Sequence, residues 1–121
     1  NVLKYTKNHE WIRVEGNKAT MGVSDYAQDS MGDVVFVELP EVGDTFAVED
    51  GLGTIESVKA VSDVYAPVAG EIVEVNEALL DEPELINTDP LGNGWLVVIE
   101  MEDPAQLDDL MSEEEYQAFI Q

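Results

Sequence analysis

One lysine stands out in the segment GTIESVKAVSDVYAPVAGEIVEVN, residues 53–76. Lys59 is the only lysine or arginine between Ala19 and Gln121. The apolar segments on either side of it predict two strands joined by a tight turn, with Lys59 at the exposed tip. An amine at a rigid tip could be acylated, which would remove its charge and turn the side chain into a long neutral tether. The alternative is an ordinary solvated lysine.

The neighbours of Lys59 argue against direct catalysis by its amine. Glu56 lies three residues before it and Asp63 four residues after it, and both carboxylates favour the charged ammonium. A lysine that forms a Schiff base needs burial or neighbouring cations to lose its proton. Val58 and Ala60 add little bulk, so the amine should be accessible to another protein.

The remaining residues form no recognisable catalytic or metal-binding pattern. His9 is the only histidine and cysteine is absent, which excludes histidine-rich and thiolate metal sites. No serine lies in a nucleophile elbow, and Gly51-Leu52-Gly53 lacks the third glycine and the following helix of a phosphate-binding loop. We therefore expect a non-catalytic protein.

The chain is strongly acidic. Asp and Glu total 27 against 5 Lys and Arg, a formal net charge of −22. This charge repels nucleic-acid phosphates and anionic lipids and favours encounter with basic protein surfaces, although it also suits a simple role in solubility. No apolar run reaches the roughly 18 residues of a membrane-crossing helix. We expect protein partners, with neither nucleic acid nor membrane among them.

The order of apolar segments predicts a mainly β chain. A length of 121 residues with 45% apolar residues suits one domain, residues 1–121, with one core. Ser24 and Gly32 are typical caps of a short helix over Asp25–Met31, and two short helices are expected at about residues 103–121. A strand pair is predicted at 5–23, with a turn at 15–17. Further strands are predicted at 33–39 (a buried strand), 46–48, 53–58, 61–66, 71–76 and 95–101, and a loop at 81–94.

A six-residue pattern occurs twice in the middle of the chain. Gly32–Val37 and Gly70–Val75 share the order glycine, acid, two aliphatic residues, any residue and valine, 38 residues apart. The spacing predicts two similar β units related by a pseudo-twofold axis, with the Lys59 hairpin between them. The hairpin and repeat units span about residues 32–101.

Several further motifs accompany this pattern. They are HEW at residues 9–11, LP at 39–40, ESVKA at 56–60, SD at 62–63, APVAGEIVEVN at 66–76, PELIN at 83–87 and GW at 94–95. Together they resemble the glycine cleavage system H proteins over nearly the whole chain. Biotin carriers usually have methionine on both sides of the lysine. Lipoyl domains of 2-oxo acid dehydrogenases usually read Asp-Lys-Ala and lack the HEW motif and the C-terminal helices.

The resemblance implies a fold and a function. The fold would be all-β with short helices, a flattened barrel-sandwich of two related sheets. A lipoate ligase or lipoyl transferase would join lipoic acid to Lys59 as an amide, with Glu56, Val58 and Ala60 completing the attachment hairpin. The arm would shuttle the aminomethyl group from pyridoxal-phosphate glycine decarboxylase to the tetrahydrofolate-dependent aminomethyltransferase, and dihydrolipoamide dehydrogenase would reoxidise it. We expect a monomer in the bacterial cytoplasm, or in the mitochondrial matrix if a leader was removed.

The family also holds the loaded arm in a surface cleft. By resemblance, Glu10 is the first candidate for a carboxylate beside the cationic adduct, and Asp63 is the second. Glu10 could instead be an exposed acid at a strand start, and His9 is expected to be structural. Tyr26 stands where the family commonly has histidine, and Asn8 where a small hydroxyl residue often occurs. Tyrosine can donate a hydrogen bond but cannot become cationic.

Two other functions remain open from the sequence. One is a lipoate relay, in which an H-like protein passes lipoyl groups to other enzymes. The other is an unmodified acidic interaction module, for which Lys59→Arg would have no functional effect. The shuttle and the relay both require a modified Lys59.

Overall fold

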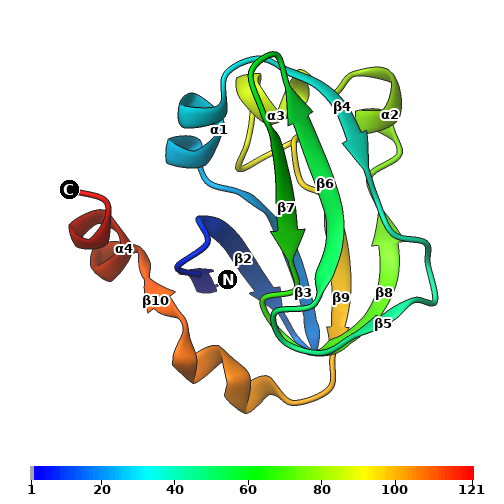
Figure 1. Ribbon diagram of the computed structural model, residues 1–121. Coiled ribbons are helices and arrows are strands. Elements are labelled where there is room, and N and C mark those ends of the chain that lie inside the picture. Colours follow the sequence, from blue (N-terminus) through cyan, green and yellow to red (C-terminus); the bar gives the residue numbers. More distant parts are fainter. Residues whose placement is uncertain (1) are drawn as a thin grey trace.

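The computed structural model describes residues 2–121 and contains two antiparallel sheets with short helices around them (Figure 1). The larger sheet has the strand order β10-β1-β2-β3-β9-β8-β5 and the smaller has the order β4-β6-β7. This confirms the expected all-β fold of two sheets with short helices. The strands of the larger sheet are β1 (Val2–Tyr5), β2 (Glu10–Glu15), β3 (Lys18–Val23), β5 (Thr45–Phe46), β8 (Gly70–Val75), β9 (Val97–Met101) and β10 (Met111–Ser112).

The smaller sheet carries the lysine hairpin. Its strands are β4 (Val34–Glu38), β6 (Gly51–Ser57) and β7 (Val61–Tyr65). The prediction of a buried strand at residues 33–39 is wrong, because Val35 and Phe36 are 49% and 55% exposed. The physical reason is that β4 is an edge strand with only one face against the core, which buries Val34 and Val37.

The two copies of the repeated pattern share a backbone irregularity. The first copy enters β4 of the smaller sheet and the second forms β8 of the larger sheet. The pairing register shifts between Val34 and Phe36 in β4, and between Ile72 and Glu74 in β8. These positions are equivalent in the two copies. Because a β-bulge re-aims side chains and bends its strand, the repeat extends from residue types to local geometry.

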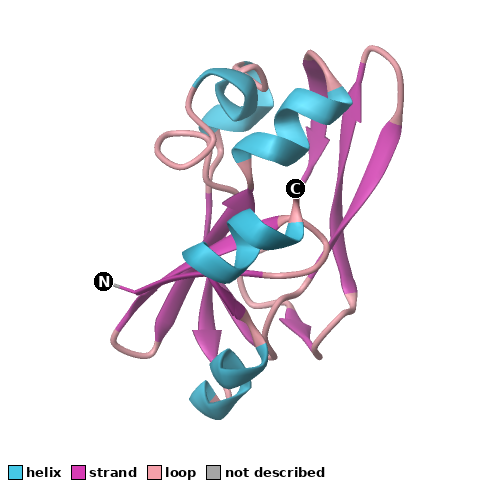
Figure 2. Cartoon of the chain, turned by 90° about the vertical axis from the view of Figure 1, so that its left-hand side faces the viewer, coloured by secondary structure: helices cyan, strands magenta, loops and turns pink. Residues whose placement is uncertain are grey.

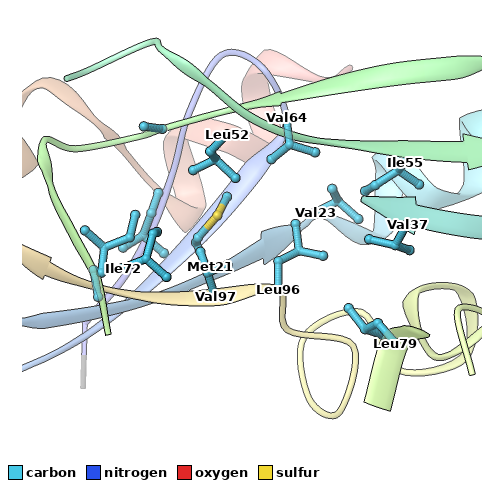
Figure 3. Close-up of a cluster of buried hydrophobic side chains, with 14 of the residues drawn as sticks. Met21, Val23, Val37, Leu52, Ile55, Val64, Ile72, Leu79, Leu96 and Val97 are labelled. Atoms are coloured by element: carbon cyan, nitrogen blue, oxygen red, sulfur yellow. The ribbon is translucent and has the colours of Figure 1, made fainter. Parts of the chain in front are cut away.

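The main core lies between the two sheets. Leu52, Ile55 and Val64 of the smaller sheet face residues of the larger sheet across the interior (Figure 3). The larger sheet and the segment that enters β9 contribute Met21, Val23, Ile72, Leu96 and Val97, all 5% exposed or less. The larger sheet buries side chains on both faces. Ile12 of β2 packs in this core, whereas its neighbour Trp11 points to the other face and packs in a second buried cluster with Tyr5 and Tyr116.

The helix predicted at Asp25–Met31 is confirmed as α1 (Asp25–Met31). The Ser24 side chain accepts a hydrogen bond from the Ala27 N–H, and Gly32 ends the helix with a φ of 81°. Near the C-terminus, the 3-10 helix η1 (Pro104–Asp109) and α4 (Glu113–Phe119) confirm the two expected helical segments. Figure 2, seen from the side that carries α1 and α4, shows both helices in front of the strands.

The expected loop at residues 81–94 is only partly a loop. It overlaps α2 (Ala78–Asp81) and contains α3 (Leu85–Thr88). Four residues are too few for a helical period to show in a sequence, and these helices are held by the burial of Leu79 and Ile86. No helix within residues 2–121 is long and apolar enough to cross a membrane.

Candidate functional site

Lys59 lies at the tip of the β6–β7 hairpin, and hydrogen bonds fix the backbone of this tip (Figure 1). The N–H groups of Lys59 and Ala60 donate to Ser57 Oγ at 3.3 and 3.2 Å. The Ser57 N–H donates to the Ala60 carbonyl at 2.8 Å, and the Val58 N–H donates to the Asp33 carbonyl at 2.9 Å. The exposed lysine is therefore presented from a backbone with defined geometry.

The side chain of Lys59 lies against Gly32, the residue that ends α1. A Cβ atom at Gly32 would come within 3.2 Å of Lys59 Cε, and the positive φ also favours glycine at this position. Asn87 of α3 holds the same loop. Its side chain accepts from the Val34 N–H at 2.8 Å and donates to the Gly32 carbonyl at 2.9 Å and to Gln28 Oε1 at 3.1 Å.

A cavity of about 430 Å³ opens beside the hairpin, next to Ala60. It is bounded by α1, by β7 and by the residues that lead into β2. Its lining includes every cleft residue predicted from the sequence, namely Asn8, His9, Glu10, Tyr26 and Asp63. The apolar part of the lining includes Val23, Ala27, Met31, Ile55 and Val64. Lys59 itself is outside the lining. A larger cavity, of about 670 Å³, contains none of the predicted residues.

Glu10 is buried, which excludes its interpretation as an exposed acid. It is 2% exposed, and its two carboxylate oxygens accept hydrogen bonds of 2.9 Å from the Thr6 hydroxyl and from the Tyr65 N–H of β7. Burial raises the pKa of Glu10 from 4.5 to about 7, against the opposing effect of these two donors, and the charge of Glu49 adds to the rise. Glu10 of β2 thus links the larger sheet to β7 of the lysine hairpin through a buried hydrogen bond.

His9 connects the cavity to the C-terminal helix. Its backbone has a φ of 67°, and its Nδ1 lies 2.8 Å from the hydroxyl of Tyr116 in α4. That hydroxyl is also 2.7 Å from Ser24 Oγ, and the Tyr116 ring stacks on Tyr5 at 4.2 Å. The His9 ring centroid is 4.9 Å from that of Tyr26, and burial lowers the pKa of His9. These contacts agree with a structural role for His9.

Of the other predicted residues, Asp63 and Asn8 line the cavity, whereas Glu56 and Val58 do not. Asp63 is exposed at the free edge of β7, and the Asn8 side chain donates to Glu49 Oε2 at 2.9 Å. Glu56 and Val58 are exposed and do not line the cavity.

Sequence reasoning missed four residues that position the site, namely Thr6, Gly32 as a support for Lys59, Ser57 and Asn87. A hydroxyl two residues before the lysine was a usable local signal for Ser57. Asn87 is part of the PELIN motif at residues 83–87, but this motif does not indicate its partners, which lie 53 or more residues away.

Comparison with known proteins identifies the family. A family model described as glycine cleavage H-protein matches residues 3–121. A glycine cleavage system H protein of Halothermothrix orenii is 59% identical over 119 residues, which cover 98% of this chain and 93% of the relative. One of Alcanivorax borkumensis is 56% identical over 118 residues, 98% of this chain and 92% of the relative. The crystal structure of a glycine cleavage system H protein from Mycobacterium marinum superposes with a TM-score of 0.90 at 40% identity, covering 98% of this chain and 95% of that one.

The chain belongs to the glycine cleavage H-protein family. The function of this family is that of a lipoyl carrier in glycine cleavage, and its members are carrier subunits of the glycine cleavage system. The resemblance inferred from the motifs around Lys59 is thereby confirmed.

Proposed function

We propose that Lys59 is the lipoylated residue of this carrier and that the chain has no catalytic activity of its own. The proposal is supported chiefly by the fixed, exposed tip that presents Lys59 next to a cavity lined by apolar side chains and two carboxylates. A lipoyl group, when bound, supplies a disulfide that is reduced as it takes up the aminomethyl group from glycine.

The residues of the cavity suit such an arm. Burial of a hydrocarbon chain against apolar walls is favourable because it removes apolar surface from water. Val23, Met31 and Ile55 would provide such walls. A cationic end group would be stabilised by a carboxylate, for which Asp63 and Glu10 are the candidates. Asp63 is exposed, whereas both oxygens of Glu10 already accept hydrogen bonds. We therefore propose that Asp63 contacts the cation and that Glu10 acts mainly by fixing β7.

Attachment of the arm requires a ligase or transferase. In the ligase reaction, Nζ of Lys59 forms an amide bond with the carboxyl carbon of lipoate. ATP is cleaved to AMP and pyrophosphate, and the carboxylate oxygen that is lost leaves in AMP. The nitrogen releases two of its protons in forming the neutral amide. Because the amide is uncharged, the modified side chain can enter an apolar cavity at lower desolvation cost than the ammonium.

The partners proposed for the modified chain are glycine decarboxylase, aminomethyltransferase and dihydrolipoamide dehydrogenase. A single lipoyl-carrier domain over residues 1–121 is supported by a family model that covers residues 3–121. A monomer is supported by the net charge of −22, which opposes self-association. A location in the bacterial cytoplasm is proposed from relatives such as that of Halothermothrix orenii.

The test is tryptic mass spectrometry after incubation with lipoate, ATP and a lipoate ligase. Lys59 provides the only tryptic site after Lys18, so modification should merge residues 19–121 into one peptide that carries a lipoyl mass. Lys59→Arg should remain unmodified and inactive in glycine cleavage, with a free energy of unfolding within about 0.5 kcal/mol of the original. Recovery of unmodified peptides 19–59 and 60–121, while a known acceptor is labelled in parallel, would contradict the proposal.

A further inference from the structure

The hydroxyl of Tyr116 joins two segments that come from distant parts of the chain. Tyr116 is 1% exposed and is the only buried residue of α4. Its hydroxyl lies 2.8 Å from Nδ1 of His9 and 2.7 Å from Oγ of Ser24, which are 107 and 92 residues away in the sequence. A tyrosine hydroxyl can donate one hydrogen bond and accept another, so it can satisfy both partners at once.

The two partners of this hydroxyl belong to two walls of the cavity of about 430 Å³ beside the lysine hairpin, which is termed the arm cavity. His9 lies in one wall, together with Asn8 and Glu10. Ser24 is the N-cap of α1, and this helix forms another wall through Tyr26, Ala27, Ser30 and Met31. Figure 2 shows α1 and α4 on the same side of the strands, as this contact requires.

A backbone hydrogen bond joins these walls at one point. The Ser24 N–H donates to the His9 carbonyl at 2.9 Å. One such bond restrains a distance but leaves the angle between the two segments free to change, as at a hinge. The Tyr116 hydroxyl adds a second connection through the side chains, and the His9 ring lies 4.9 Å from the ring of Tyr26 in α1. The angle between the two walls therefore depends on a residue of the C-terminal helix.

The backbone of His9 needs such support. Its φ of 67° lies in the left-handed region, which is unfavourable for a residue with a side chain and persists only where surrounding contacts impose it. Its sequence neighbours Asn8 and Glu10 also line the arm cavity. A change in the conformation of His9 would therefore move three cavity residues together.

We propose that Tyr116 is a positioning residue for the lipoyl arm, because it holds two walls of the arm cavity at the separation that encloses the arm. This inference rests on the proposed function, in which Lys59 carries the arm. Tyr116 does not line the arm cavity, so it acts on the arm only through His9 and Ser24.

Enclosure matters because water can attack the loaded arm. In this hydrolysis the carbon–sulfur and carbon–nitrogen bonds of the aminomethyl group break. Water supplies the oxygen of the formaldehyde that forms, and its two protons leave on the thiol and on ammonium. The rate of formaldehyde release therefore reports how well the cavity excludes water from the arm.

The first experiment measures this rate in the lipoylated protein. Glycine and glycine decarboxylase load the arm, the decarboxylase is removed, and formaldehyde is followed over time. Tyr116→Phe should release formaldehyde about fivefold faster than the original, the change expected when one hydrogen bond that favours the closed cavity is lost. Phenylalanine keeps the ring that stacks on Tyr5 at 4.2 Å, so circular dichroism should show that the variant folds like the original.

Asn76→Ala is the matched control for a loss of stability without a change in the arm cavity. Asn76 is 7% exposed and donates to the carbonyl groups of Asn93 and Trp95 at 2.8 Å each, outside the lining of the arm cavity. Urea unfolding should show that this variant is destabilised at least as much as Tyr116→Phe. Its formaldehyde release should nevertheless stay within about twofold of the original, because distant sites act independently.

Met31 provides a second readout that does not depend on the chemistry of the arm. It lines the arm cavity, whereas Met101 lines the separate cavity of about 670 Å³. With isotope-labelled methionine methyl groups, loading of the arm should shift the NMR signal of Met31 in the original protein and leave that of Met101 unchanged. The shift of Met31 should be smaller in Tyr116→Phe, because the arm then spends more time outside the cavity.

The outcomes separate positioning from stability. Formaldehyde release and a Met31 shift that are both unchanged in Tyr116→Phe would overturn the inference and assign Tyr116 to stability alone. Equal acceleration in Asn76→Ala would also overturn it, since enclosure would then follow general stability. A Met31 signal that does not move on loading of the original would overturn it as well, because the arm would lie outside this cavity. Failure of an active ligase to modify Lys59 would contradict the proposed function instead.

Discussion

Replacement of Glu10 by glutamine tests the coupling between the buried carboxyl and folding. In the unfolded chain a glutamate titrates near 4.5, whereas burial raises the pKa of Glu10 in the folded protein to about 7. Between these pH values the folded state binds more protons than the unfolded state. The free energy of unfolding therefore falls as pH rises through this window. The difference of about 2.5 pKa units, at about 1.36 kcal/mol each, corresponds to about 3 kcal/mol.

The assay is urea unfolding of Glu10→Gln and of the original protein at several pH values from 4.5 to 8. Glutamine cannot titrate, and the other carboxylates are common to both proteins. The stability of the variant relative to the original should therefore increase by about 3 kcal/mol across this range. Glu74→Gln is the matched control, since Glu74 is an exposed strand residue whose substitution removes the same charge, and its difference should stay within about 0.5 kcal/mol. A flat difference for Glu10→Gln would refute the reasoning.

Two further substitutions test the elements that support the site. Asn87→Ala removes the acceptor of the Val34 N–H and the donor to the Gly32 carbonyl. Urea unfolding should therefore show that the free energy of unfolding falls by about 2 kcal/mol. An unchanged free energy of unfolding would contradict the role of Asn87. Tyr116→Phe removes the hydroxyl that lies within hydrogen-bond distance of the His9 ring. The free energy of unfolding should fall by about 1 kcal/mol, and hydrogen exchange in α4 should become faster. Unchanged exchange would show that stacking on Tyr5 alone holds this helix.

Local signals in the sequence were sufficient where neighbouring residues decide the structure. Ser24 and Gly32 predicted both ends of α1 because capping involves residues within one turn. The start of α4 is local in the same way, since Ser112 and Glu115 form a capping box. The turn that presents Lys59 is equally local, since Ser57 bonds residues two and three positions later.

Long-range packing decided what the sequence could not. The continuous apolar run of β4 predicted a buried strand, and only the tertiary structure shows that one face of the strand is left exposed, with Phe36 on it. The short helices α2 and α3 depend on burial of Leu79 and Ile86, and no periodicity can show in four residues. Asn87 reaches the loop beneath Lys59 from 53 or more residues away.

The sequence by itself therefore determined the family, most of the strands and the lysine at the tip, because motifs, caps and turns depend on adjacent residues. It missed β1 (Val2–Tyr5) and placed β10 (Met111–Ser112) in a helical region. Only the tertiary structure decided the environment of that lysine. It buried Glu10 between Thr6 and the Tyr65 N–H, gathered the cavity residues from three separate segments, and left several apolar side chains of the smaller sheet exposed. The physical reason is that burial, and with it the pKa of a carboxyl or the accessibility of a side chain, depends on contacts between residues far apart in the chain.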